Sequence, residues 1–181
     1  MSSDQSLTRQ VDYRRCAVDN RRLVGSLGLS ALPRTADVTV HDLGEPVVVS
    51  LEFDEDMQRR VLLRGHLKTT LALPCQRCLE AAEQAIDTSI GGIVVTSDSA
   101  AADVPREWEP IMADGDTLDL YALVDDELLL ALPMTVQCDR PDCRAAYDKQ
   151  PAVPESDKPA SDKPNPFAAL ASLKRDDDSS R

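Results

Sequence analysis

Aromatic residues are scarce in this sequence, whose 181 residues include only 2 Phe, 3 Tyr and 1 Trp. A hydrophobic core must therefore be mainly aliphatic, and a hydrophobic content of 42% is enough to build one. Long apolar runs are also missing: no stretch approaches the roughly 20 apolar residues of a membrane span, and the start has no secretory apolar segment. We therefore expect a cytoplasmic protein without membrane contact.

Excess positive charge is lacking as well, since 32 acidic and 20 basic residues give a net charge of −12. This balance argues against a protein that coats nucleic acid, because phosphate binding requires a positive field. The imbalance is concentrated in residues 96–135, which contain one basic and ten acidic side chains. Such a stretch either attracts a basic partner, such as a ribosomal protein, or forms a solvated face that maintains solubility.

Four of the five cysteines form two pairs. Cys75 and Cys78 follow a strand-like run with two residues between them, and Cys138 and Cys143 are separated by four. Four thiols in two such pairs are typical of a tetrahedral zinc site. We predict that these cysteines bind one structural zinc ion, with no open position for chemistry. The alternatives are inert buried cysteines or a redox couple of Cys75 and Cys78, while Cys16 is interpreted as a free thiol.

Alternating apolar residues predict three strands, near residues 47–53, 61–74 and 84–95. A helix is expected over 117–132, with Asp116 as its N-cap. The connections are short enough for hairpins, and no crossover helices of a parallel sheet are evident. The predicted fold is therefore α+β: an antiparallel sheet covered by one helix, with the Cys75 pair at a strand end.

The segment that follows the third strand is expected to be an acidic loop over residues 96–116. Just before it, Gly91 and Gly92 indicate a bulge or a close approach of another backbone. Trp108 either anchors the loop to the core or is an exposed binding residue, and anchoring is the more usual role.

The polar side of the predicted helix is a candidate surface for a basic partner. The residues concerned are Asp125, Asp126 and Glu127. These carboxylates could also be imagined as a two-metal nuclease site, but no His or further convergent acid accompanies them, which favours a solvated helix face.

Four basic side chains on and just before the second predicted strand form a short stripe. This stripe is a candidate for contact with an RNA backbone. The residues concerned are Arg59, Arg60, Arg64 and Lys68. The alternative is a plain solvent-facing sheet surface, because no aromatic residues are interleaved with these cations.

The composition changes near residue 149, so we expect residues 1–148 to form a single α+β domain. Residues 149–164 contain a tandem Ser-Asp-Lys-Pro and predict a flexible linker. A short helix is expected over 165–175, followed by an acidic disordered tail at 176–181. The apolar side of this helix is expected to dock on a partner. It consists of Phe167, Leu170 and Leu173.

Four stretches of the chain resemble the YceD family, the large ribosomal RNA subunit accumulation proteins of bacteria. They are Leu73-Pro74-Cys75-Gln76-Arg77-Cys78, Trp108-Glu109-Pro110-Ile111, Asp119-Leu120 through Leu132-Pro133, and Lys163-Pro164-Asn165-Pro166-Phe167 through Leu173-Lys174. The resemblance implies a role in the accumulation or processing of large-subunit ribosomal RNA, and hence in large-subunit assembly. It supplies no catalytic residues.

The expected function is therefore that of a non-enzymatic assembly factor with no small-molecule substrate. Its expected partner is a basic large-subunit ribosomal protein, a ribosomal RNA precursor, or both. The alternative is an enzyme: either a thiol oxidoreductase using Cys75 and Cys78, or a metal-dependent RNA-processing enzyme using the acidic residues of the helix.

Overall fold

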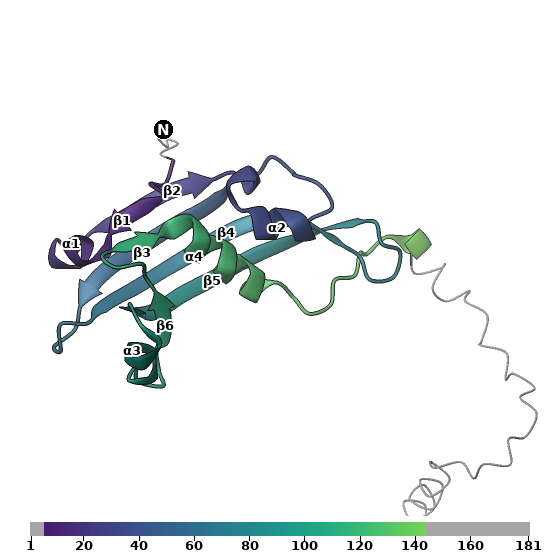
Figure 1. Ribbon diagram of the computed structural model, residues 1–181. Coiled ribbons are helices and arrows are strands. Elements are labelled where there is room, and N and C mark those ends of the chain that lie inside the picture. Colours follow the sequence, from purple (N-terminus) through teal and green to yellow (C-terminus); the bar gives the residue numbers. More distant parts are fainter. Residues whose placement is uncertain (1–5, 144–181) are drawn as a thin grey trace, which may run out of the picture. The chain divides into compact units, whose positions relative to one another are not determined.

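The computed structural model describes residues 6–143 (Figure 1). The predicted linker at 149–164, the short helix at 165–175 with Phe167, Leu170 and Leu173, and the tail at 176–181 all lie outside the described residues. Within the described part, none of the helices has the length and apolar character that crossing a membrane requires.

A five-stranded sheet in the order β2-β3-β4-β5-β6 forms the centre of the fold. Its strands are β2 (Arg22–Leu27), β3 (Val47–Glu55), β4 (Val61–Pro74), β5 (Ala81–Val95) and β6 (Glu109–Met112). Neighbouring strands are antiparallel from β2 to β5, and β6 is parallel to β5. The α+β prediction is confirmed, and β3, β4 and β5 are the three strands that the alternation predicted.

One face of the sheet carries the main core. Along β4, Leu63, Leu67 and Leu71 are buried, whereas Arg64 and Lys68 point to the other face and are exposed. The buried face is covered by short helices and a two-stranded sheet (Figure 1). These elements are α1 (Tyr13–Val18), η1 (Leu29–Ala31), α2 (Pro33–Val38), α4 (Leu120–Ala131), β1 (Gln10–Asp12) and β7 (Thr117–Asp119).

The prediction of an acidic loop over residues 96–116 is wrong, because this segment contains α3 (Asp98–Ala102) and β6. α3 lies in the crossover connection between β5 and β6, which makes β6 parallel to β5. Trp108 packs with the second apolar cluster, which includes Leu62 and Ile93 of the outer sheet face. Trp108 therefore has the anchoring role that we favoured.

The covering helix begins later than predicted, at Leu120. Its N-cap is Asp119, which accepts hydrogen bonds from the amides of Tyr121 (2.9 Å) and Ala122 (3.1 Å). Asp116 does not cap the helix, because residues 117–119 pair with β1 as a strand. The Asp116 carboxylate lies 3.2 Å from the guanidinium of Arg14 instead.

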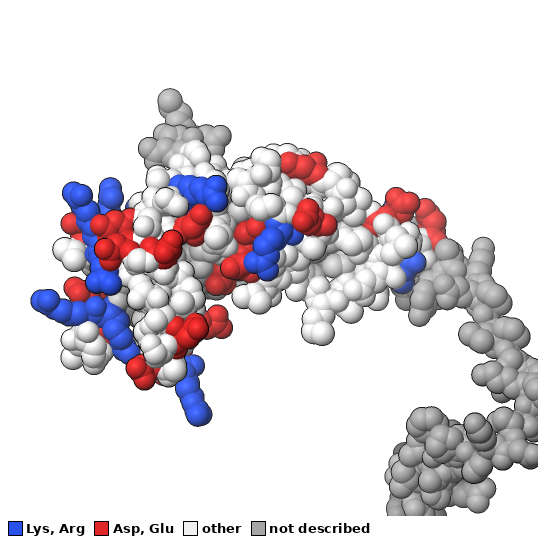
Figure 2. Space-filling view, in the orientation of Figure 1, with Lys and Arg blue, Asp and Glu red and all other residues white. Residues whose placement is uncertain are grey.

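Charges that are far apart in the sequence meet in the fold. Arg9, Arg14 and Arg34 form ion pairs with Asp119, Asp116 and Asp126, respectively. On the face that carries α4, basic and acidic side chains lie side by side (Figure 2). The acidic stretch 96–135 is therefore partly neutralised by arginines from the first 34 residues, which counting charges along the chain did not reveal.

Replacing Gly92 with alanine is expected to destabilise the fold. A Cβ atom at this position would lie 2.6 Å from the carbonyl oxygen of Glu109 and 2.7 Å from Ile111, so β6 could not approach β5. We expect thermal or urea unfolding to show a loss of about 1–3 kcal/mol. Gly91→Ala is the matched control, because its Cβ would have only an ordinary 3.6 Å contact with Trp108. Equal stability of the two variants would contradict this packing.

Candidate metal centre

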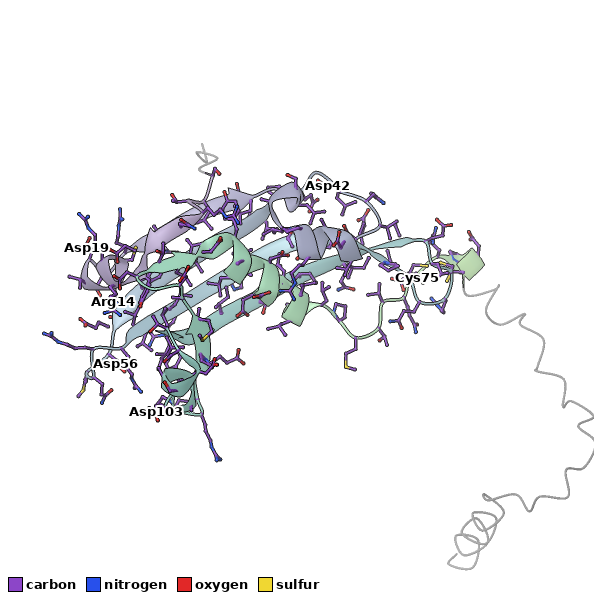
Figure 3. All side chains as sticks on the ribbon, viewed as in Figure 1. Arg14, Asp19, Asp42, Asp56, Cys75 and Asp103 are labelled. Carbon is purple, nitrogen blue, oxygen red and sulfur yellow. The ribbon has the colours of Figure 1, made fainter. Side chains whose placement is uncertain are left out.

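The first cysteine pair lies in the turn between β4 and β5, at the end of the sheet (Figure 3). The turn is closed by hydrogen bonds from the amide of Cys75 to the Glu80 carbonyl (2.9 Å) and from the amide of Leu79 to the Cys75 carbonyl (2.8 Å). Leu79 has a φ of 62°, so the backbone reverses direction tightly there. This turn presents Cys75 and Cys78 together.

The second pair is carried to the turn by the chain that leaves α4. The amide of Gln76 donates to the Val136 carbonyl at 2.9 Å, and its side-chain amide donates to the Met134 carbonyl at 3.0 Å. These contacts hold the segment that leads to Cys138 and Cys143. The end of β4 and the chain that leaves α4 therefore meet at the four cysteines.

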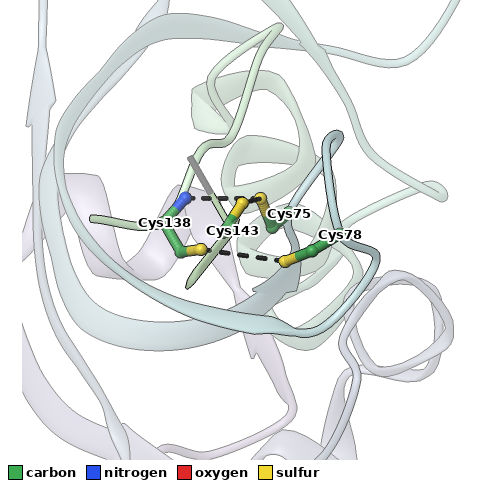
Figure 4. Close-up of side chains that lie close together, drawn as sticks. All are labelled: Cys75, Cys78, Cys138 and Cys143. Atoms are coloured by element: carbon green, nitrogen blue, oxygen red, sulfur yellow. Dashed lines mark hydrogen bonds between the residues drawn. The ribbon is translucent and has the colours of Figure 1, made fainter. Parts of the chain in front are cut away.

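The four sulfur atoms form a compact cluster (Figure 4). All lie within 4.8 Å of one another, with 3.9 Å between Cys75 and Cys143 and 3.8 Å between Cys78 and Cys138. Sulfurs arranged tetrahedrally at 2.3 Å around one ion would be about 3.8 Å apart. The cluster could thus hold a metal ion with little rearrangement, whereas Cys16 is buried in α1 and is not part of it.

Hydrogen bonds favour the thiolate form in part of the cluster. The amide of Cys138 donates to the Cys75 sulfur at 3.4 Å and, with further backbone amides, lowers the pKa of Cys75 to about 5. The side chain of Arg140 donates to Cys138 and lowers the pKa of that thiol. Burial raises the pKa of Cys143 to about 12. A bound dication would supply the charge that converts the Cys143 thiol to a thiolate ligand.

Two arginines balance the charge of the cluster. Arg140 donates to the sulfur of Cys78 at 3.1 Å, and Arg77 donates to the carbonyl oxygen of Cys138 at 2.6 Å. Four thiolates around a divalent ion carry two net negative charges, which the two guanidinium groups can offset. Four sulfurs around one ion would also complete a tetrahedral shell and would leave no position for a reactive water.

The prediction that Asp125 lies on an exposed acidic side of the helix is wrong. Asp125 is only 4% exposed, and its carboxylate accepts hydrogen bonds from the amides of Arg34 (3.0 Å) and Thr35 (2.8 Å) and from the Thr35 hydroxyl (2.6 Å). These amides belong to the first turn of α2, whose own N-cap residue, Leu32, has no side-chain acceptor. Asp125 therefore caps α2 from α4 and is unavailable to a partner.

The neighbouring acids of α4 have different environments. Asp126 is exposed and forms an ion pair with Arg34. Glu127 is half-buried, and its pKa is raised by burial and by the nearby carboxylates of Glu109 and Asp126. Within residues 6–143, the four cysteines are the only group of three or more potential ligands close enough to share an ion. The acids of α4 thus lack the convergence that a two-metal nuclease requires.

The predicted basic stripe is not a continuous free surface. Arg60 donates to Asp56 at 2.6 Å, and the guanidinium of Arg64 lies 5.3 Å from the centre of the Trp108 ring. Lys68 lies 3.8 Å from a carboxylate oxygen of Asp87. Arg59 is in the β3–β4 turn and has no ion pair among the described residues. Most of the positive charge is therefore already engaged within the fold.

Sequence reasoning did not identify Arg77 and Arg140 as parts of the site. The available signal was their position: Arg77 lies between the first two cysteines, and Arg140 lies between the last two. A cation inside each ligand turn is placed to neutralise the thiolates that flank it.

Comparison with known proteins identifies relatives of this chain. No solved structure matches the chain significantly. The large ribosomal RNA subunit accumulation protein YceD of Haemophilus influenzae is 34% identical over 160 residues, covering 86% of this chain and 90% of the relative. The family model described as large ribosomal RNA subunit accumulation protein YceD matches residues 63–174, a span that contains all four cluster cysteines. The chain therefore belongs to the YceD family.

Proposed function

We propose that this protein is a non-enzymatic factor in the accumulation of large-subunit ribosomal RNA and in large-subunit assembly. The observation that carries the proposal is family membership, together with a relative that is named for large ribosomal RNA subunit accumulation and is covered along most of its length. The closed four-sulfur cluster supports a structural rather than a catalytic centre.

The ion in the cluster is zinc in this proposal. Zinc favours four thiolates in a tetrahedron, and the sulfur separations of 3.8 and 3.9 Å suit its bond lengths. Bound zinc would join the β4–β5 turn to the segment after α4. The four cysteines of the cluster would hold this segment in place, and no chemical step at the metal is required.

Binding through a basic ribosomal protein is favoured over coating of RNA. The chain has a net charge of −12, and three of the four cations in the predicted stripe already have partners. The predicted helix at 165–175 would supply a second, tethered contact through Phe167, Leu170 and Leu173. Two linked weak contacts, one through the acidic domain and one through the predicted helix, can give a firm association. Once one contact has formed, the other binding site is held at a high local concentration near its target.

Deletion of the gene is expected to lower the amount of large-subunit ribosomal RNA relative to small-subunit ribosomal RNA. Expression of the intact chain should restore the ratio, which can be measured by quantitative RNA blotting and by sucrose-gradient profiles. An unchanged ratio and an unchanged large-subunit peak in the deletion strain would contradict the proposed function.

A tagged pull-down tests the mode of binding separately. We expect a basic large-subunit ribosomal protein to be recovered after RNase treatment and to be lost when residues 165–174 are deleted. Association that RNase abolishes and that this deletion leaves intact would instead assign the contact to RNA.

A further inference from the structure

A groove lies between β6, the β6–β7 connection and α4, and it is separate from the cysteine cluster. Its volume is about 510 Å³, which can hold a few side chains of a partner. All four residues of β6 line it, and β6 is the last strand of its sheet. Within residues 6–143 the outer edge of β6 therefore has no strand partner.

The groove is acidic and has no basic residue in its lining. Five of its lining residues carry carboxylates: Glu109, Asp114, Asp119, Asp126 and Glu127. Asp119 and Asp126 are paired with arginines outside the groove. Among the described residues, Glu109, Asp114 and Glu127 have no ion pair, so three carboxylates of the lining remain unneutralised. On the face in Figure 2, acidic side chains lie above and below an uncharged area in the region of β6 and α4.

The floor and one wall of the groove are apolar. Ile111, Leu118 and Leu123 are buried at its base, whereas Met112 and Leu130 are 52% and 75% exposed. The exposed apolar side chains are poorly solvated, whereas the unpaired carboxylates beside them are hydrated and keep a negative field at the groove. A matching partner would supply apolar side chains and positive charge together.

Other ligand classes fit this groove less well. RNA would bring phosphates against an acidic lining, which is unfavourable. A single metal ion would require three or more converging ligand atoms, and among residues 6–143 only the cysteines provide such a group. Burial and the neighbouring carboxylates of Glu109 and Asp126 raise the pKa of Glu127, and a cationic partner would relieve this repulsion.

We infer that the groove between β6 and α4 binds an extended segment of a protein partner in which basic residues alternate with apolar ones. The basic residues would meet Glu109 and Glu127, the apolar residues would cover Met112 and Leu130, and the segment would run along the free edge of β6. The inference rests on the proposed function, which supplies the expectation of a basic ribosomal protein as partner.

Binding of defined peptides to the full chain tests the groove without requiring the cellular role. The probe is a fluorescent peptide of about ten residues in which Lys alternates with Leu, measured by anisotropy at about 0.15 M salt. Comparison probes replace Leu with Ser or Lys with Glu, and a single-stranded RNA of similar length tests the nucleic-acid alternative.

The test variant is Glu109→Gln with Glu127→Gln, which removes two charges from side chains that have no hydrogen bond or ion pair among residues 6–143. Glu45→Gln with Glu83→Gln is the matched control, because both residues are exposed and lie outside the groove. We expect the first variant to bind the Lys-Leu peptide at least about tenfold more weakly, and the control to bind within about twofold of the natural chain.

An apolar variant completes the test. Leu130→Ser should weaken binding of the Lys-Leu peptide but not of the Lys-Ser peptide. Absence of peptide binding, equal weakening in both charge variants, or RNA binding as tight as peptide binding would overturn the inference. None of these outcomes would alter the ribosomal RNA ratio in the deletion strain, so failure of the groove and failure of the proposed function are distinguishable.

Discussion

Replacing Cys78 with serine is expected to reduce the metal content from about one ion per chain to nearly none, because three thiolates no longer close a tetrahedron. Structural zinc contributes about 10–16 kcal/mol of apparent binding free energy in small zinc folds, which makes this the largest single effect that we expect. The measurement is metal analysis of the purified protein after dialysis.

Loss of the ion should act locally at first. The segment that leads to Cys138 is held by the amide of Gln76, the side chain of Arg77 and the cluster itself. Hydrogen exchange at the amides of Gln76 and Cys138 should therefore accelerate, because they donate to the Val136 carbonyl and the Cys75 sulfur, while the amides of β3 to β5 stay protected. Cys16→Ser is the control, because Cys16 is a buried cysteine outside the cluster and its replacement should leave the metal bound. A Cys78→Ser protein with a full metal content would refute the site.

Replacing Asp125 with alanine should cost about 3 kcal/mol of unfolding free energy. The change leaves the first-turn amides of α2 and the Thr35 hydroxyl without their acceptor, in a place where both Asp125 and Thr35 are buried. The contact between α2 and α4 depends on this carboxylate, so both helices should lose protection. Chemical denaturation gives the free energy directly.

Asp126→Ala is the matched control on the same turn of α4. Asp126 is exposed, and its pair with Arg34 is a surface ion pair, so the change should cost less than about 1 kcal/mol. The loss of unfolding free energy for Asp125→Asn should lie between the losses for Asp125→Ala and Asp126→Ala. One side-chain oxygen can still accept a hydrogen bond, while the new amide nitrogen faces a donor. Similar losses for Asp125→Ala and Asp126→Ala would show that the cap is not important.

Local patterns predicted the parts of the fold in which neighbouring residues share one environment. Along β4, Leu63, Leu67 and Leu71 recur on one face, so alternation alone identified the strand and its buried side. The clustering of the cysteines was predictable for a similar reason, since the spacing within each pair is typical of a turn that can present two sulfurs to one ion.

Features that depend on distant residues could not be predicted in this way. β6 has only four residues and includes Pro110, and it is a strand because Gly92 lets it approach β5 closely. Asp125 resembles any acid on a helix surface until α2, some ninety residues earlier in the chain, presents its uncapped amides. In both cases the partner residue, and not the local sequence, determines the structure.

X-ray absorption at the zinc edge of the zinc-loaded protein tests the central claim, that the four cysteines converge on a single closed metal site. The sulfur cluster predicts four sulfur ligands at about 2.3 Å and no nitrogen or oxygen ligand. A shell with three or fewer sulfurs and an added oxygen or nitrogen would contradict it, because it would show an open position where the structure brings four thiolates together.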